Sequence, residues 1–123
     1  MFQGLRTLTL QVTDLAAAKA WYTRAMGVAP YFDEPFYVGF NVGGYELGLQ
    51  PLDPAKAPPP LGDRATTYWG VDDVPAAMAH LSALGAADVS GPENVGDGIV
   101  VGTLRDPFGN LFGVIHNPHF TAR

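Results

Sequence analysis

The chain has 123 residues, 47% of them hydrophobic, and a formal net charge of −5 at pH 7. This length and composition suit one domain with its own core. No Lys/Arg cluster interrupts the acidic balance, so nucleic acid and anionic membranes are not expected partners. The absence of cysteine excludes disulfides and thiolate metal sites. Because we find neither a secretory leader nor a membrane-spanning run, we expect a cytoplasmic protein.

The first half of the chain predicts a strand, a helix and three strands. Residues 7–12, TLTLQV, alternate apolar and polar side chains, which is typical of a strand with one face under a helix. Asp14 is the predicted N-cap of a helix that runs to about Met26, and Gly27 ends it. The helix has one apolar stripe: Leu15, Ala18, Tyr22 and Ala25. The three strands are expected at 29–33, 36–42 and 45–50.

The segment 53–63, DPAKAPPPLGD, is too rich in proline for a helix or a central strand, and it is interpreted as a linker. It divides a single domain, 1–123, into module 1 (1–52) and module 2 (64–118). Module 2 repeats the order of module 1. Its expected elements are a strand at 66–71, a helix capped by Asp73 with the stripe Val74, Met78 and Leu81, and strands at 87–89, 98–105 and 111–116.

An internal repeat supports this division. The stretch VTDLAAAKAWYTRAMG (12–27) matches VDDVPAAMAHLSALG (71–85) in its Val-x-Asp start, its Ala-rich body and its closing glycine. Later in each half, 43–51 matches 108–116, which pairs Gly48 with Gly113. Each half is therefore predicted to be a βαβββ module, and the fold class is α+β.

These features resemble the vicinal-oxygen-chelate superfamily, which includes glyoxalase I, extradiol dioxygenases, fosfomycin-resistance enzymes and bleomycin-resistance proteins. The most specific of them is RDPFGNLFGVI at 105–115, near the end of the second module. The resemblance spans nearly the whole chain. It implies two βαβββ modules that form an open curved barrel, with a ligand on the concave face. In metal-dependent members it also implies His and Glu ligands for a divalent cation that polarises the substrate.

The resemblance assigns the metal ligands to four positions of this chain. A histidine commonly stands seven residues before the aspartate at the start of each helix, which here gives Thr7 and Thr66. A glutamate commonly stands seven residues after the aspartate of the Asp-Pro-x-Gly turn, which here gives Gly113, with Gly48 as its counterpart in module 1. None of the four supplies an imidazole or a carboxylate, so we expect no metal and no cofactor.

Strand alternation predicts which residues share the concave face. They are Thr7, Thr9, Gln11, Glu46, Gly48, Gln50, Thr66, Tyr68, Leu111 and Gly113, together with Ile115. Glu46 is the candidate general base or polar anchor, with a solvated carboxylate at the rim as the alternative. Gly48 and Gly113 either open space for a ligand or serve packing alone. His80, His116 and His119 are expected at the surface or in structural roles.

The preferred hypothesis is a glyoxalase/bleomycin-resistance-like protein that binds a small, partly apolar or aromatic molecule without metal. The alternative is an enzyme of this superfamily, of lyase, isomerase or dioxygenase-like type, with Glu46 as general base or with an unrecognised metal site. A third possibility is a structural or partner-binding domain with a filled cavity. Because small members pair modules across chains, the resemblance also implies a homodimer.

Overall fold

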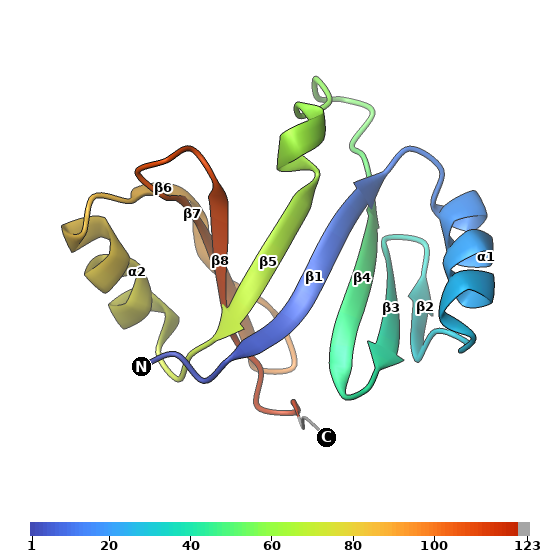
Figure 1. Cartoon of the computed structure of the whole chain (residues 1–123), viewed down its shortest axis with the longest axis horizontal. Helices are drawn as coiled ribbons and strands as arrows, with labels where there is room; N and C mark the ends of the chain where they lie inside the picture. Colours follow the sequence, from blue (N-terminus) through green and yellow to red (C-terminus); the bar gives the residue numbers. More distant parts are fainter. Residues whose placement is uncertain (121–123) are drawn as a thin grey trace. The chain divides into compact units, whose positions relative to one another are not determined.

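The computed structural model describes residues 1–120, and these fall into two compact units. The N-terminal unit comprises Thr7–Ala65, and the C-terminal unit comprises Met1–Arg6 together with Thr66–Phe120. Each unit holds one α-helix and a sheet of four strands, as Figure 1 shows. The chain order within each half is strand, helix and three strands, which confirms the predicted α+β class and its two βαβββ modules.

The sheet of the N-terminal unit has the order β2-β3-β4-β1. Its elements are β1 (Leu5–Val12), α1 (Leu15–Met26), β2 (Phe32–Glu34), β3 (Tyr37–Val42) and β4 (Tyr45–Pro51). Strands β1 and β4 are parallel, whereas β2, β3 and β4 pair as antiparallel neighbours. Strands β1 and β3 therefore flank β4, and this arrangement decides the geometry of the site described below.

Helix α1 begins and ends where the sequence predicts. The Asp14 carboxylate accepts a hydrogen bond from the Ala17 amide at 3.0 Å, and Gly27 closes the helix in the left-handed conformation with φ of 73°. The core between α1 and the sheet consists of Val38, Phe40, Leu47 and Leu49, packed against Leu10, Val12, Leu15, Ala18 and Tyr22. Ala25, the last member of the predicted stripe, is exposed.

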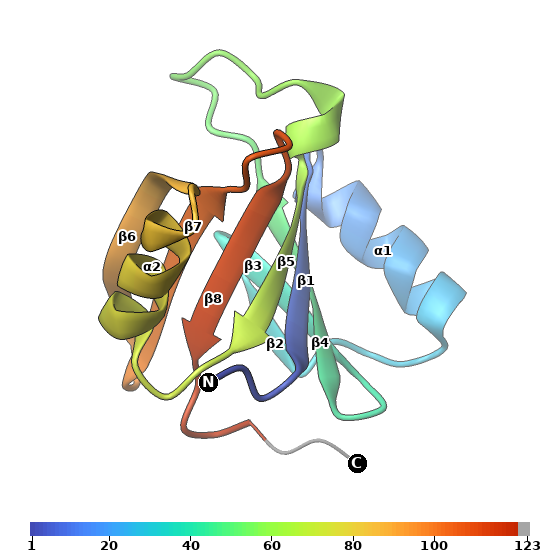
Figure 2. The same ribbon diagram turned by 60° about the vertical axis from the view of Figure 1, so that its left-hand side comes forward.

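The sheet of the C-terminal unit has the order β5-β8-β7-β6. Its elements are β5 (Ala65–Gly70), α2 (Val74–Ala83), β6 (Ala87–Gly96), β7 (Ile99–Arg105) and β8 (Leu111–His116). Asp73 caps α2, as predicted, by accepting from the Ala76 amide at 3.0 Å. Figure 2 shows α2 lying along the side of β6, β7 and β8, where the core residues are Val71, Val74, Ala77, Met78, Leu104 and Val114.

Two predicted strands have different lengths in the structure. The strand expected at 29–33 is reduced to Phe32–Glu34, and the strand expected at 87–89 extends over Ala87–Gly96. Strand β6 pairs with β7 through several register shifts, and all its residues are exposed. An edge strand with bulges tolerates a proline such as Pro92, and it needs no alternation of apolar and polar residues. The hydrophobic pattern therefore did not indicate that the strand continues beyond residue 89.

Between β4 and β5, the segment 53–63 forms no strand, and its only regular element is the 3-10 turn Leu61–Asp63. The proline-rich composition predicted this irregular path. Neither α1 nor α2, the α-helices of the described residues 1–120, is long and apolar enough to span a membrane.

Candidate ligand-binding face

The N-terminal unit places its predicted site residues on the face of the sheet opposite α1. The register pairs Thr7 with Glu46, Thr9 with Gly48, and Gln11 with Gln50 across β1 and β4. Neighbours in register share one face of a sheet. On β3, Asn41 pairs with Glu46 and Gly39 pairs with Gly48, so they lie on the same face.

Glu46 is the centre of this face and is held by three hydroxyl groups. The Tyr37 hydroxyl donates to its Oε1 at 2.7 Å, and the Thr7 hydroxyl donates to the same oxygen at 3.3 Å. The Tyr31 hydroxyl donates to its Oε2. We call Glu46, Thr7, Tyr31 and Tyr37 the Glu46 cluster. Sequence reasoning identified Glu46 and Thr7 but missed both tyrosines: Tyr37 lies on β3 beside β4, and Tyr31 directly precedes β2 and is tied to β3 by a hydrogen bond from its amide to the Gly39 carbonyl.

Both tyrosines of the cluster remain protonated donors in neutral solution. Partial burial raises the pKa of Tyr31 above its ordinary value, and the hydrogen bond and negative charge of Glu46 raise it further. Burial also raises the pKa of Tyr37, and the Glu46 charge adds to this effect, whereas a hydrogen bond with Thr9 opposes it. Because the two phenols stay neutral, the charge of the cluster is that of the Glu46 carboxylate alone.

The Tyr37 ring explains why residue 48 is a glycine. Tyr37 lies on β3, and its hydroxyl reaches Thr9 on β1, so the ring passes over the intervening strand β4 at Gly48. A Cβ at residue 48 would lie 2.5 Å from Cζ of Tyr37 and would also collide with its hydroxyl. Only a residue without a side chain leaves room for this crossing.

A second crossing is found in the C-terminal unit. Tyr68 lies on β5, and its hydroxyl forms a hydrogen bond with Thr103 on β7, so the ring passes over β8 at Gly113. A Cβ at residue 113 would lie 2.5 Å from Cδ1 of Tyr68 and 2.9 Å from the Thr67 carbonyl oxygen. Burial raises the pKa of Tyr68, and Glu93 adds to this effect, while the bond with Thr103 opposes it.

The predicted site residues are thus divided between the two units. Thr7, Thr9, Gln11, Glu46, Gly48 and Gln50 belong to the N-terminal unit, and Thr66, Tyr68, Leu111, Gly113 and Ile115 belong to the C-terminal unit. Within the second group, Gly113 pairs with Tyr68 and with Thr103, and Leu111 pairs with Arg105. Thr66 is buried and Gln50 is exposed. The structure brings Glu46 together with Thr7, and Tyr68 together with Gly113.

The four positions to which the resemblance assigns metal ligands do not fit a divalent cation. The Thr7 hydroxyl already donates a hydrogen bond to Glu46, and the space next to Gly48 and Gly113 is filled by tyrosine rings. Residues 1–120 contain no group of three or more His, Asp or Glu side chains arranged to hold a metal ion. A site for such an ion needs several convergent imidazole or carboxylate donors, and at these positions only Glu46 is adjacent.

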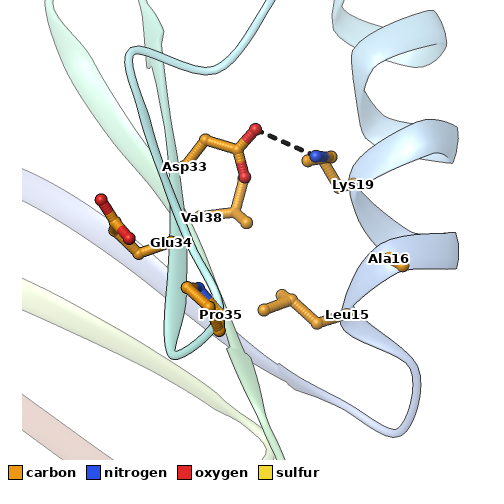
Figure 3. A pocket seen from close by; sticks show the side chains of 7 residues that line it. All are labelled: Leu15, Ala16, Lys19, Asp33, Glu34, Pro35 and Val38. Carbon is orange, nitrogen blue, oxygen red and sulfur yellow. Dashed lines mark hydrogen bonds and ion pairs between the residues drawn. The ribbon is translucent and has the colours of Figure 1, made fainter.

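A separate pocket lies on the opposite face of the same sheet, between α1 and the β2–β3 hairpin (Figure 3). It has a volume of about 350 Å³ and is lined by Leu15, Ala16, Lys19, Asp33, Glu34, Pro35 and Val38. Lys19 and Asp33 form an ion pair at 2.9 Å across it, and both side chains are substantially exposed. None of the predicted site residues lines this pocket.

Solved structures with similar folds cover most of the chain. Methylmalonyl-CoA epimerase from Mycobacterium tuberculosis is 18% identical, with a TM-score of 0.73 over 94% of this chain and 88% of that chain. A glyoxalase/bleomycin resistance protein/dioxygenase superfamily member from Vibrio splendidus 12B01 is 17% identical, with a TM-score of 0.67 over 92% and 99%. A hypothetical protein from Bacillus halodurans C-125 is 13% identical, with a TM-score of 0.73 over 97% of each chain.

At these identities the similarity shows the fold alone, and no curated protein matches the sequence. The family assignment comes from the sequence profile of the Glyoxalase/Bleomycin resistance protein/Dioxygenase superfamily, which matches residues 4–114. That range runs from β1 into β8 and contains both tyrosine crossings. The chain therefore belongs to the Glyoxalase/Bleomycin resistance protein/Dioxygenase superfamily.

Proposed function

We propose that this protein binds a small, partly apolar or aromatic molecule on the strand face that carries the Glu46 cluster, and that it does so without a metal ion. One observation carries the proposal. Glu46 is only half-buried, three hydroxyls fix its carboxylate, and the adjoining Tyr31 side chain is 63% exposed. A ligand can therefore approach a polar group whose orientation is already determined.

The cluster has the composition of a small-molecule site. Such sites combine apolar and aromatic walls with a few positioned polar groups. Here the aromatic groups are Tyr31, Tyr37 and Phe32, which pairs in register with Gly39, and the polar group is Glu46. Because the hydroxyls already hold the carboxylate, binding requires little further loss of side-chain freedom.

Chemical-shift mapping on the isotope-labelled protein tests this proposal. Single-ring aromatic compounds, neutral and charged, are titrated while backbone amide signals are followed. We expect the amides of Gly39, Gly48 and Glu46 to shift in a saturable way, while the amide of Val114, in the core beside α2, does not. Shifts confined to residues of the pocket in Figure 3, such as Ala16, would contradict the proposal.

Independence from metal has its own test. The donor set at Thr7, Gly48, Thr66 and Gly113 supports the proposal, since it offers no imidazole and no carboxylate. We expect a titration with Mn²⁺ to cause no saturable, site-specific broadening of the amides at residues 7, 48, 66 and 113. Broadening at these amides with a stoichiometry of one ion per chain would overturn this part of the proposal.

An enzymatic function is the second candidate, and the position of Glu46 favours it. A half-buried carboxylate next to an exposed phenol is placed where a general base could remove a proton. However, a carboxylate has about four lone-pair sites, and three hydroxyls already donate to this one, so the role of anchor is favoured over that of base.

Deuterium exchange separates these two functions. A similar structure is that of a methylmalonyl-CoA epimerase, so methylmalonyl-CoA in deuterium oxide is the first substrate to test. If Glu46 is only an anchor, the protein will not accelerate exchange at the α-carbon. Acceleration that is lost in Glu46→Gln, a variant that retains the size of the side chain, would establish the enzyme instead.

We also propose that the chain forms a homodimer. Partly exposed apolar side chains in the C-terminal unit support this: Phe2 and Trp69, which are 40% and 36% exposed, both contact the Phe112 ring. Sedimentation at micromolar concentration should then give a mass near twice 13.1 kDa. A mass of one chain at all concentrations would contradict the dimer. The cytoplasmic location stays a prediction.

A further inference from the structure

We infer that the group of the ligand that meets Glu46 is an organic cation, such as an amidinium or a substituted ammonium, attached to an aromatic or otherwise flat apolar body. This inference rests on the proposed function, because it concerns the same face, and it specifies the class of ligand. The observation that carries it is a half-buried carboxylate that has three hydroxyl partners and, among the described residues of the N-terminal unit, no cationic partner.

The negative charge of Glu46 has no cationic partner within its own unit. Among the described residues of the N-terminal unit, Thr7–Ala65, no Lys or Arg nitrogen forms an ion pair with its carboxylate oxygens. The basic side chains of the N-terminal unit are engaged or placed elsewhere: Lys19 pairs with Asp33, Arg64 donates to the Pro59 carbonyl, Arg24 is in the last turn of α1, and Lys56 is in the segment after β4.

Hydroxyl partners leave this charge in place. Three hydroxyls satisfy lone pairs of the carboxylate, but a hydroxyl carries no formal charge. The raised pKa values of Tyr31 and Tyr37 show that neither phenol gives up its proton at neutral pH. A carboxylate that is partly removed from water is stabilised most by a group of opposite charge. Glu34, exposed and in register with Tyr37, adds a second negative charge to the same face.

The aromatic groups around the carboxylate also suit a cation. Phe32 contacts Phe36 and Tyr37 edge-to-face, with ring centroids 6.0 and 6.1 Å apart. Tyr31 and Phe36 are 63% and 66% exposed, and Phe32 is 39% exposed. The faces of such rings attract ammonium and guanidinium-like groups, and they also pack against a flat apolar body. A carboxylate beside exposed rings therefore favours a cationic aromatic ligand over a neutral or anionic one.

Three probes of nearly equal size test the charge preference: benzamidinium, benzamide and benzoate. Their affinities are measured from the amide shifts of Gly39 and Gly48 in the full chain at low ionic strength. We expect benzamidinium to bind at least tenfold more tightly than benzamide, and benzoate to cause no saturable shift. In Glu46→Gln, benzamidinium and benzamide should bind within twofold of each other, while benzamide keeps its wild-type affinity.

Glu34→Gln is the matched control. It removes the same charge from an exposed residue of the same face that has no place in the Glu46 cluster. Water and salt screen an exposed charge, so this variant should keep most of the preference for benzamidinium. Equal losses of preference in Glu34→Gln and Glu46→Gln would show that only the general negative field matters, and would overturn the assignment to Glu46.

The remaining outcomes separate this inference from the proposed function. If benzamide and benzamidinium bind equally well at Gly39 and Gly48 in the wild-type protein, the face binds aromatic molecules and the inference of a cation is wrong. If no probe shifts these amides, both the inference and the proposed function are contradicted. A Glu46→Gln variant that is unfolded is recognised by its lost amide dispersion. The wild-type protein is then tested at raised ionic strength, where most of the preference for benzamidinium should persist because a partly buried charge is screened less than an exposed one; its complete loss would contradict the assignment to Glu46.

Discussion

In both tyrosine crossings a tyrosine ring passes over a glycine of the neighbouring strand, but the strands that supply the tyrosine and the threonine are exchanged between the two units. In the N-terminal unit, Tyr37 comes from β3 and reaches Thr9 on β1 over Gly48. In the C-terminal unit, Tyr68 comes from β5, the counterpart of β1, and reaches Thr103 on β7 over Gly113. Gly48 and Gly113 therefore occupy equivalent positions of the internal repeat, whereas the tyrosine and the threonine come from opposite flanking strands in the two units.

The difference between the crossings lies in what surrounds the hydroxyl. Tyr37 also donates to Glu46, which is in turn held by Thr7 and Tyr31. The strand position in β8 that corresponds to Glu46 is Leu111, two residues before Gly113, so the second crossing has no carboxylate there. We conclude that the second crossing serves stability, whereas the first also orients a charged group for a ligand.

Gly113→Ala should give the largest loss of stability. The new Cβ would lie 2.9 Å from a backbone carbonyl oxygen and 2.5 Å from the base of the Tyr68 ring, and neither can move without disturbing β5. We expect a loss of about 3 kcal/mol in urea unfolding, at the upper end of overpacking effects, and a greater loss for Gly113→Leu. If Gly113→Ala left the free energy of unfolding unchanged, the second crossing would be absent.

Gly48→Ala should destabilise the protein less than Gly113→Ala but should weaken ligand binding more. Its Cβ would meet the outer end of the Tyr37 ring, which can swing away more easily than a backbone atom. We expect a loss of about 2 kcal/mol in the same unfolding assay. Because the displaced ring releases Glu46, aromatic probes should also bind more weakly, whereas Gly113→Ala should leave their affinity unchanged as long as the protein is folded.

Removing the hydroxyls alone sharpens the comparison. Tyr37→Phe loses a hydrogen bond to a carboxylate as well as the bond with Thr9, so we expect a loss of about 1.5 kcal/mol. Tyr68→Phe loses a bond between two neutral hydroxyls, for which about 1 kcal/mol is expected. Thermal unfolding of both variants at pH 7 measures the difference. A larger effect at Tyr68 would contradict the special role of the first crossing.

Alkaline pH should weaken both crossings. Folding raises the pKa values of Tyr37 and Tyr68 above 10.0, so the folded protein holds these protons more tightly than the unfolded chain. Their contribution is complete below about pH 10 and is lost as pH rises further, by at most about 1.4 kcal/mol per pH unit for each group. Urea midpoints between pH 9 and 11 measure this decline, and each Tyr→Phe variant should show a shallower one.

The smallest effect is expected at the turn before β8. Asp106 accepts hydrogen bonds from the amides of Phe108 and Asn110, and these bonds lower its pKa. A carboxyl group with a lowered pKa stabilises the fold above its unfolded value near 4, and this contribution is lost as pH falls through the folded value. Asp106→Asn should lower the melting temperature slightly at pH 7 and leave it unchanged at pH 2.

The sequence predicted the modules because alternation, caps and glycine stops are local signals. Asp14 and Asp73 cap their helices as expected, and the apolar stripes pack onto the sheets. Strand parity was also sufficient to place Thr7, Glu46 and Gly48 on one face. The length of β6 could not be predicted, since a bulged and fully exposed edge strand carries no periodic pattern.

The content of the site was harder to predict than its position. The two glycines were recognised as unusual, but no local pattern indicates that a ring on another strand fills the space beside them. Tyr31 and Tyr37 reach Glu46 only through the antiparallel register of β3 with β4 and with β2, and the sequence pattern places these strands without fixing their register. A tyrosine two residues before a glycine that pairs with another glycine is the signal that could have identified the crossing.

A double-mutant cycle on Gly48 and Tyr37 tests the central claim most directly, namely that the glycine exists to let the tyrosine cross its strand. The cost of Gly48→Ala is measured by urea unfolding in the wild-type protein and in Tyr37→Ala, where the ring is absent. We predict a cost of about 2 kcal/mol in the wild-type protein and less than about 0.5 kcal/mol in Tyr37→Ala. Equal costs in the two backgrounds would contradict the crossing and the account built on it.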